Sequence, residues 1–434
     1  MTAASRTGQA AHLLLAAYLV GLLAVPKLPT SIAALACITA LVAAHGSWRE
    51  DARGAWRHMA VLVVPAAAYL LLLLVQIVVG MAPFKMSSQV LVGSLALAVG
   101  LSSVPGRPAD VRRLLLPAAA IGAIGASLLA VWQVWGLDYE RPYGWLGGNA
   151  LGNGAIKFGD LAVVQGLLAF VLVLFGAERW RRLLGLAGLF CAMLALALTQ
   201  TRGGIVGFLL AVVVLAIALA LRYRRVGTAG PHGSHGGLRR GTTIAMVALA
   251  VVLTLSAAGF MQDRFAQIEP QVARYLHGDI EGSQVGQRFA LWHAAIRAGV
   301  AHPLTGVGFG RFGDEIERQR AEGDIPASLE IQYQQVHSEY LTAFAEAGVA
   351  GFAALLLMFV APAAALFRRV ARGDASPAAC AALVTATAFA GFALTDDMFD
   401  RQITVIAFYL LNAWLLRAAW GARPAAGAGV APGS

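Results

Sequence analysis

Long apolar segments, separated by short polar ones, recur along almost the whole chain. A transmembrane helix needs about 20 consecutive, mostly apolar residues to cross the hydrocarbon core of a bilayer. Twelve segments meet or approach that length, and their apolar cores are residues 9–25, 30–45, 59–80, 87–103, 114–135, 158–177, 183–199, 204–221, 242–260, 340–366, 376–394 and 402–420. The pattern predicts an all-α polytopic membrane protein with about twelve transmembrane helices, in which residues 1–434 form a single integral membrane domain.

The composition agrees with this prediction. Hydrophobic residues make up 59% of the 434 residues and charged residues 13%, whereas soluble domains have about 45–50% and about 25%. The polar surface is too small for a soluble enzyme, a disordered chain or a fibrous repeat. Only Arg6 precedes the first apolar segment, and no clear small-residue cleavage site follows it. We therefore expect a retained first span and no cleaved signal peptide.

The basic residues alternate between the two predicted sides of the membrane. Lys and Arg number 33 against 23 Asp and Glu, which gives a net charge of +10. One set of loops and termini holds 20 of the basic residues, the short loops of the other set hold six, and the remaining seven lie in the long segment 261–339. By the positive-inside rule both termini are cytoplasmic, and segments 136–157 and 261–339 lie outside. This topology explains the positive charge, so no nucleic-acid partner is expected.

The long outer segment 261–339 does not have the composition of a flexible linker. Aromatic and apolar residues follow one another at helical spacing in Phe289, Trp292, His293 and Ile296, and the pattern stops at Pro303. This spacing predicts short helices that lie at the membrane surface.

The predicted spans contain almost no ionisable residues in their interiors. Charges at mid-membrane usually mark ion paths or proton relays, so their scarcity argues against an ion-coupled transporter or a pump. The chain also has no G-x-x-x-x-G-K-[ST] motif for ATP. The polar residues gather at the outer face, which favours chemistry on a lipid-borne substrate at the membrane–water interface.

Three outer-face residues have side chains suited to such chemistry. Arg202 lies in the tight turn Thr199–Gly204, where a guanidinium can bind phosphate with two hydrogen bonds. Arg288 lies on the predicted amphipathic helix, and His337 lies where the long loop meets the tenth span. An imidazole at that position can accept a proton from a sugar hydroxyl near neutral pH. The alternatives are an interfacial anchor for Arg202, a solvated helix face for Arg288 and a capping role for His337.

Several further outer residues are weaker candidates. Asp396, Asp397 and Asp400, in the last outer loop, could hold a divalent cation, orient His337 or an arginine, or simply be solvated. The turn Gly306–Gly310 resembles a phosphate loop but lacks the βαβ context, which favours an ordinary turn. Candidates for binding a headgroup or a sugar are Arg141, Tyr143, Lys157, Asp160 and Arg311.

The cysteines do not suggest a metal site. Cys37, Cys191 and Cys380 each lie inside an apolar segment and show no metal-ligand spacing. We expect inert, buried thiols, and neither a metal nor another cofactor.

Three motifs in order resemble one family. They are Thr201-Arg202-Gly203-Gly204, then Arg288 followed by His302-Pro303-Leu304-Thr305-Gly306-Val307-Gly308, then His337-Ser338-Glu339-Tyr340-Leu341 leading into Glu346-Ala347-Gly348-Val349-Ala350-Gly351. This series is similar to the bacterial O-antigen ligase and polymerase superfamily, most clearly over residues 195–355. The upstream Ala155-Ile156-Lys157-Phe158-Gly159-Asp160 also resembles the ligase pattern, although Gly-Ala stands where ligases often have Asn-Pro.

The resemblance implies a glycosyltransferase of the bacterial inner membrane with a GT-C-like fold and a periplasmic active site. Such ligases transfer polysaccharide from undecaprenyl pyrophosphate to a sugar of the lipid A–core oligosaccharide, without a metal and with inversion. The two essential arginines of the family correspond to Arg202 and Arg288, its essential histidine to His337, and a carboxylate of the last outer loop to Asp396 or Asp397. Under this hypothesis the arginines stabilise the leaving pyrophosphate and His337 deprotonates the acceptor.

Three other functions remain open at this stage. An O-antigen polymerase uses the same donor, but such polymerases tend to have two large outer loops, whereas this chain has one. A protein O-oligosaccharyltransferase is usually longer at its C-terminus. A lipid or polysaccharide transporter would need a polar central cavity, which the predicted spans do not show.

Overall fold

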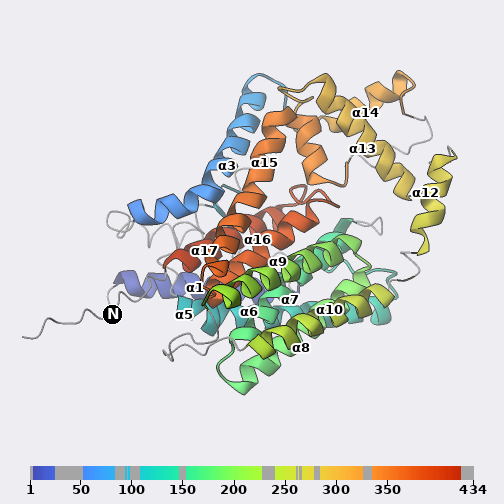
Figure 1. The fold of residues 1–434 in the computed structure, drawn as a ribbon. Coiled ribbons are helices and arrows are strands. Elements are labelled where there is room, and N and C mark those ends of the chain that lie inside the picture. Colours follow the sequence, from blue (N-terminus) through green and yellow to red (C-terminus); the bar gives the residue numbers. More distant parts are fainter. Residues whose placement is uncertain are drawn as a thin grey trace, which may run out of the picture.

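The fold is described from a computed structural model of the chain. The residues it describes are 3–24, 52–83, 93–94, 96–97, 108–145, 153–226, 240–260, 262, 266–277, 284–325 and 335–421. Every regular element among these residues is helical (Figure 1). The structure therefore has the all-α character that the hydrophobic pattern predicts.

The described helices have the following bounds. In the first half they are α1 (Ala3–Gly21), α3 (Ala52–Val78), α5 (Pro108–Asp110), the π-helical turn η2 (Val111–Leu115), α6 (Leu116–Val131), the π-helical turn η3 (Trp132–Gly136), α7 (Asn153–Phe175) and α8 (Arg179–Thr199). In the second half they are α9 (Arg202–Val226), α10 (Arg240–Phe260), α12 (Ile268–Leu276), α13 (Gln284–Ala301), α14 (Phe312–Ala321), α15 (Glu339–Ala371), α16 (Pro377–Phe392) and α17 (Gln402–Gly421).

Seven helical segments within the described residues are long and apolar enough to cross a membrane. They are His58–Val78, Val111–Gly136, Gly154–Phe175, Arg179–Thr199, Arg202–Arg225, Glu339–Ala371 and Gln402–Trp420. Three shorter apolar helical segments, His12–Gly21, Val247–Ser256 and Pro377–Phe392, coincide with further predicted spans. The predicted span 30–45, and all but a few residues of 87–103, lie outside the described residues. The polytopic helical architecture is confirmed, and the total of twelve spans stays a prediction.

Helix α7 lies at the centre of the bundle, in contact with α6, α8, α9 and α16 (Figure 1). Nearly all of its side chains are buried. Small residues allow the neighbouring helices to approach closely, as where α16 crosses α9. A Cβ atom added to Gly391 would lie 2.7 Å from the Cα atom of Gly207. Such small-residue contacts are typical of helix packing in membranes, where dispersion forces replace the hydrophobic effect.

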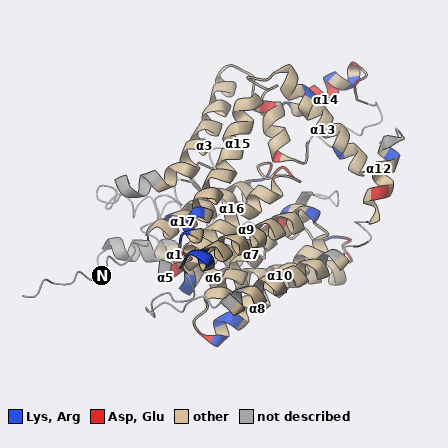
Figure 2. Ribbon diagram, in the orientation of Figure 1, with Lys and Arg blue, Asp and Glu red and all other residues tan. Residues whose placement is uncertain are grey.

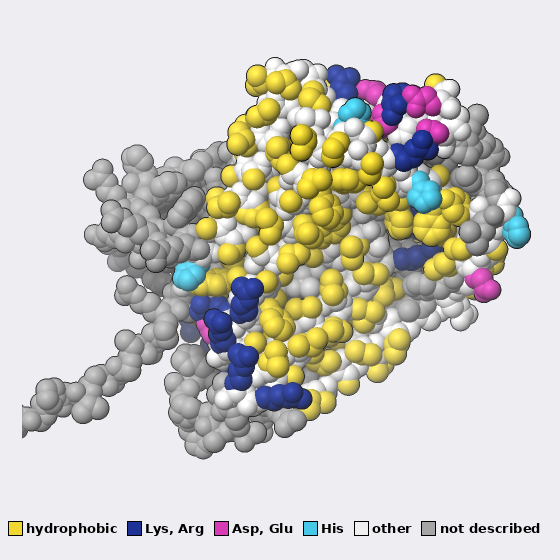
Figure 3. Space-filling view, turned by 45° about the horizontal axis from the view of Figure 1, so that its top comes forward, with side chains coloured by type: hydrophobic (Ala, Val, Ile, Leu, Met, Phe, Trp, Pro, Cys, Tyr) yellow, Lys and Arg dark blue, Asp and Glu magenta, His cyan; other side chains and the backbone are white. Residues whose placement is uncertain are grey.

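The two ends of the bundle differ in charge. Figure 2 shows Lys and Arg grouped near the end of α17 and the start of α8, whereas basic and acidic residues alternate on α14. The basic C-terminal ends of α9 and α15 contact neighbouring segments. Arg222 of α9 donates to the carbonyl of Gly373 at 3.1 Å, and Arg369 of α15 lies 5.0 Å from the ring centroid of Trp420. Figure 3 shows a broad hydrophobic surface between the basic region and the region of mixed charge. The starts of α7, α9 and α15 lie at the end of the bundle opposite the basic ends.

Helices α12, α13 and α14 occupy the described part of the long segment 261–339 (Figure 1). Helix α13 ends before Pro303, where the helical pattern stops in the sequence, and its Ala-rich face is the one buried in the protein. Ile296 is 42% exposed, and small side chains at Ala294, Ala295 and Ala298 are buried instead. The short side chains let α13 pack closely on α15 and α14. A position at the membrane surface stays a prediction.

Candidate functional site

A buried ion pair joins α7 to the loop between α16 and α17. The ammonium of Lys157 bonds the Oδ2 atom of Asp396 and the backbone carbonyl of Asp397, and lies 3.1 Å from the Oδ1 atom of Asp400. The side chains of Lys157 and Asp396 are each 1% exposed. A buried charge must be paired to be tolerated, so this contact fixes the loop against the start of α7.

His337 lies directly beside this ion pair. Its Nδ1 atom is 3.4 Å from the Oδ1 atom of Asp396, and its backbone N–H donates to the Oδ2 atom of Asp397 at 2.9 Å. Its φ of 57° is in the left-handed region, which histidine adopts more readily than most residues but which still costs energy. The hydrogen bond to Asp397 holds the backbone in this conformation.

The first turn of α15 and the α16–α17 loop are joined by several further hydrogen bonds. The backbone N–H of Glu339 donates to the carbonyl of Ala393 at 3.0 Å, and the N–H of Phe399 donates to the Oε2 atom of Glu339 at 2.9 Å. The hydroxyl of Thr342 donates to the Oδ1 atom of Asp397 at 2.5 Å. Gln335 donates to Asp400 at 2.9 Å. These bonds make the site one connected polar network.

The three loop carboxyls differ in acidity. Burial raises the pKa of Asp396, but the adjacent Lys157 and His337 outweigh burial and hold that pKa below its usual value. Burial raises the pKa of Asp397 and of Asp400; the charge of Asp396 adds to this effect, and Lys157 opposes it. Asp396 therefore carries the negative charge that faces His337, while the other two carboxyls retain a proton more readily.

The sequence left open a divalent-cation site at these aspartates. In the structure the ammonium of Lys157 lies between Asp396 and Asp400, where a cation would otherwise balance the two carboxylates. Within the part of the chain that the structure describes, no group of three or more His, Cys, Asp or Glu side chains is arranged to hold a metal ion.

Arg202 is the first residue of α9 and lies close to the same loop. A Cβ atom added to the next residue, Gly203, would overlap the side chain of Thr395 and lie 3.9 Å from a carboxyl oxygen of Asp160. The preceding turn is fixed by Arg141, whose Nε atom donates to the carbonyl of Thr199 at 2.7 Å. The predicted role of Arg141 in substrate binding is untested, and its observed contact supports the α8–α9 turn.

Arg288 lies in the second turn of α13. One helical turn later on the same face, the indole of Trp292 donates to the carbonyl of Val336 at 3.0 Å. That hydrogen bond joins α13 to the residue just before His337. The helix therefore holds Arg288 on the side of α13 that faces the loop-to-α15 junction.

Tyr143 and Arg311 lie in other contacts. The ring of Tyr143 stacks on Tyr139 with 5.1 Å between centroids, and the hydrogen bond that the Tyr143 hydroxyl donates to Tyr139 raises the pKa of Tyr143. The Nε atom of Arg311 donates to the carbonyl of Met81 at 3.0 Å, which joins the start of α14 to the end of α3. The structure brings Lys157, Asp396, Asp397 and His337 into direct contact, but these two residues are outside that network.

The glycine-rich turn pairs with a break in α15. Gly348, with φ of 65°, interrupts that helix, and the N–H of Val349 donates to the carbonyl of Pro303 at 2.8 Å. In return, the N–H groups of Val307 and Gly308 donate to carbonyls of α15 at 2.9 and 3.0 Å. These N–H groups are already used within the protein, so the turn is a packing element and not a phosphate cradle.

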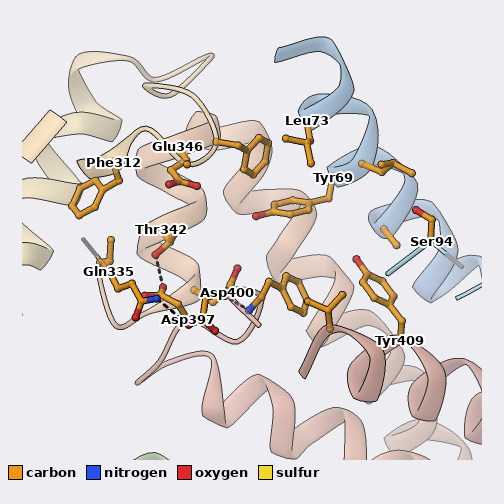
Figure 4. Close-up of a pocket in the computed structure, with 18 of the residues that line it drawn as sticks. Tyr69, Leu73, Ser94, Phe312, Gln335, Thr342, Glu346, Asp397, Asp400 and Tyr409 are labelled. Carbon is orange, nitrogen blue, oxygen red and sulfur yellow. Dashed lines mark hydrogen bonds between the residues drawn. The ribbon is translucent and has the colours of Figure 1, made fainter. Parts of the chain in front are cut away.

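A pocket of about 510 Å³ opens next to this network (Figure 4). One wall is an apolar face of α3, and the opposite side carries the carboxyl groups of Glu339, Glu346, Asp397 and Asp400. The volume falls within the range of about 300–1,000 Å³ that is common for small-molecule sites. Figure 4 shows Tyr69 and Glu346 directed toward the same space, from α3 and α15 respectively.

Part of the chain is similar to known proteins. Residues 187–356 match the sequence model of a family described as O-antigen ligase. The resemblance to the O-antigen ligase family is confirmed. The chain is also 24% identical, over 252 residues, to an uncharacterized protein of Haemophilus influenzae. That alignment covers 58% of this chain and 59% of the relative.

The stretch that matches the O-antigen ligase family includes Arg202, Arg288 and His337. Lys157 precedes it and Asp396 follows it, so the ion pair comes from parts of the chain outside the match. The role of each residue in the site stays a prediction.

Glu339, Glu346 and Gln335 were not singled out from the sequence. In the structure Lys157 and Asp160 lie near the start of the apolar helical segment Gly154–Phe175, and Glu339 and Glu346 lie near the start of Glu339–Ala371. Ionisable residues inside a predicted span are unusual. That rarity is the signal by which Glu346 could have been found.

Proposed function

We propose that this chain is an O-antigen ligase. It transfers polysaccharide from undecaprenyl pyrophosphate to a sugar of the lipid A–core oligosaccharide. The family match supports a ligase or polymerase type of reaction. The observation that carries the proposal furthest is the contact of His337 with Asp396, at the end of the bundle opposite the basic helix ends.

His337 acts as the general base in this proposal. When Nδ1 carries the hydrogen and donates to Asp396, Nε2 is the basic nitrogen of the ring. It accepts the proton of the acceptor hydroxyl as that oxygen bonds to the anomeric carbon of the donor. The ionised Asp396 then stabilises the imidazolium, which is the role of the aspartate in a Ser-His-Asp triad. Lys157 keeps Asp396 ionised and in place.

Arg202 and Arg288 stabilise the leaving group. The bond between the anomeric carbon and the pyrophosphate oxygen breaks, and the electron pair stays on undecaprenyl pyrophosphate. Positive groups held in advance near that developing charge lower the barrier. The start of α9 lies beside Thr395, and α13 is joined to Val336, so the two helices that carry the arginines contact segments next to His337, which supports this role. The pyrophosphate supplies the energy of the reaction, and no nucleotide is needed.

The proposed location is the inner membrane, with both termini in the cytoplasm and the site facing the periplasm. The excess of basic residues at the ends of α9, α15 and α17 supports this orientation. The donor and acceptor would both be presented at the outer leaflet.

The test is deletion of the gene in its host, followed by gel analysis of the lipopolysaccharide. A ligase predicts loss of the polysaccharide ladder while long polysaccharide accumulates on undecaprenyl pyrophosphate. The variants His337→Ala and Arg288→Ala should insert into the membrane normally, but complementation with either should not restore the ladder. His277→Ala, which changes an exposed loop histidine, is the matched control and should restore it.

Other outcomes identify the other functions. Single-repeat products in place of the ladder would indicate a polymerase. An unchanged ladder would reject both reactions and direct attention to glycosylated proteins or to transport.

A further inference from the structure

The pocket next to the His337 network is lined by carboxyl groups. They belong to Glu339, Glu346, Asp397 and Asp400, and no Lys, Arg or His is among the described residues that line it. An anion that leaves water needs paired positive groups beside it. A pyrophosphate, which carries several negative charges, is therefore disfavoured in this pocket and is better placed on the side of the two arginines.

The opposite wall of the pocket is apolar. Val63, Ala66, Leu70 and Leu73 recur at helical spacing and present one face of α3 to it. Phe309 adds an aromatic ring, which meets the ring of Tyr69 edge to face at 5.2 Å. The pocket thus combines hydrogen-bond acceptors on one side with an apolar surface on the other. A neutral sugar has the complementary surfaces, because its hydroxyls donate hydrogen bonds and its C–H faces are apolar.

Two polar groups in the pocket have unused hydrogen-bonding capacity. Glu339 is 4% exposed, and its Oε2 atom accepts from Phe399, but no described residue donates to its Oε1 atom. The hydroxyl of Tyr69 points into the pocket and has no hydrogen-bond partner among the described residues (Figure 4). Both side chains line the pocket, so both groups are available to a polar ligand.

The pocket also reaches the catalytic candidate. Gln335 and Val336, the two residues before His337, both line it, and Asp397 contributes to both the pocket and the His337 backbone bond. A hydroxyl-bearing ligand in the pocket would therefore lie close to the proposed base.

We propose that this pocket is the acceptor subsite, an inference that rests on the proposed ligase function. It binds a sugar of the acceptor through hydroxyls that donate to Glu339 and bond to the Tyr69 hydroxyl, with the sugar's apolar face against α3. Its described lining offers no cation to the donor pyrophosphate, so donor and acceptor reach His337 from opposite sides.

The test uses the purified full-length chain in lipid nanodiscs. Initial rates are measured while the undecaprenyl-pyrophosphate polysaccharide and the lipid A–core glycolipid are varied separately. Tyr69→Phe removes one hydroxyl and should raise the KM for the glycolipid by about threefold to tenfold, without changing the KM for the donor. Glu339→Gln should act in the same direction. Tyr223→Phe at the other end of α9 and Glu317→Gln on the exposed face of α14 are matched controls.

The outcomes separate this inference from the ligase function. A higher KM for the donor, or unchanged KM values in both pocket variants, would overturn the acceptor subsite while the ligase function stands. If the wild-type chain transfers nothing, the ligase function fails. Equilibrium binding of the same glycolipid then tests whether the pocket binds the acceptor. Weaker binding to Tyr69→Phe than to Tyr223→Phe would support the subsite, and equal binding would reject it.

Discussion

The Nδ1 atom of His337 lies 3.4 Å from the Oδ1 atom of Asp396, a residue 59 positions later in the chain. The other oxygen of the same carboxylate bonds Lys157. A single carboxylate thus connects a titratable ring to a buried cation. In this arrangement the ring is oriented by a group that is itself held in place, as precise proton transfer requires.

Asp396→Asn should reduce turnover much more than it reduces binding of the donor. The amide keeps the shape but can neither stabilise an imidazolium nor select the same ring tautomer. We expect a loss on the order of 10²–10⁴ in kcat, with little change in the KM for the donor. Single-turnover rates in nanodiscs measure this effect. A variant with wild-type kcat would remove Asp396 from the mechanism.

Lys157→Met should destabilise the folded chain. The change leaves the buried carboxylate of Asp396 without its cation, and breaking such a pair costs about 3–5 kcal/mol. Thermal unfolding in detergent should show the loss, and the double variant Lys157→Met, Asp396→Asn should recover part of it. If the two single losses simply add, the ion pair is not energetically coupled.

Asp397→Asn should change how stability depends on pH. Burial raises the pKa of Asp397 in the folded state above the ordinary value of 3.8. The folded chain therefore binds that proton more tightly than the unfolded chain, and it loses stability as pH rises from the ordinary value through the raised one.

The variant has no such proton, so its unfolding temperature should fall less across that range than that of the wild type. Unfolding temperatures measured at a series of pH values compare the two directly. Parallel curves would mean that the Asp397 carboxyl has the same pKa in both states.

Gly348→Ala should disrupt the break in α15. Its positive φ disfavours any side chain, and a Cβ atom would also overlap the carbonyl of Pro303. Gly323→Ala is the matched control, because it has a φ of 81° but no atom within 4 Å of its Cβ position. The control should lose about 1–2 kcal/mol from the backbone alone, and Gly348→Ala should lose more. Equal losses in unfolding experiments would show that the Pro303 contact is not tight.

The sequence predicts the helices well because a span of about 20 apolar residues is a local signal. The ends of α7, α8, α9 and α17 follow directly from where charged or turn-forming residues interrupt that signal. The buried face of α13 is harder to predict. Its Ala-rich side is buried because close packing on α15 favours small side chains over the aromatic ones.

The details of the site depend on tertiary contacts that no local pattern contains. His337 could be singled out because it is polar and lies at a span end. Its contact with Asp396, and the pairing of that carboxylate with Lys157, require the α16–α17 loop to fold against α7. Glu346 escapes notice as a site residue because an apolar helix surrounds it in the sequence, and only the structure shows that the backbone N–H groups of Gly310 and Phe312 donate to it.

The ion pair also has a consequence for synthesis of the chain. Lys157 and Asp396 are 239 residues apart, and bacterial or eukaryotic ribosomes add about 5–20 residues per second. Asp396 is therefore synthesised on the order of tens of seconds after Lys157. During that time α7 cannot occupy its final buried position with Lys157 charged and unpaired. The centre of the bundle is thus completed late, when the last helices arrive, although the helix that forms it is made early.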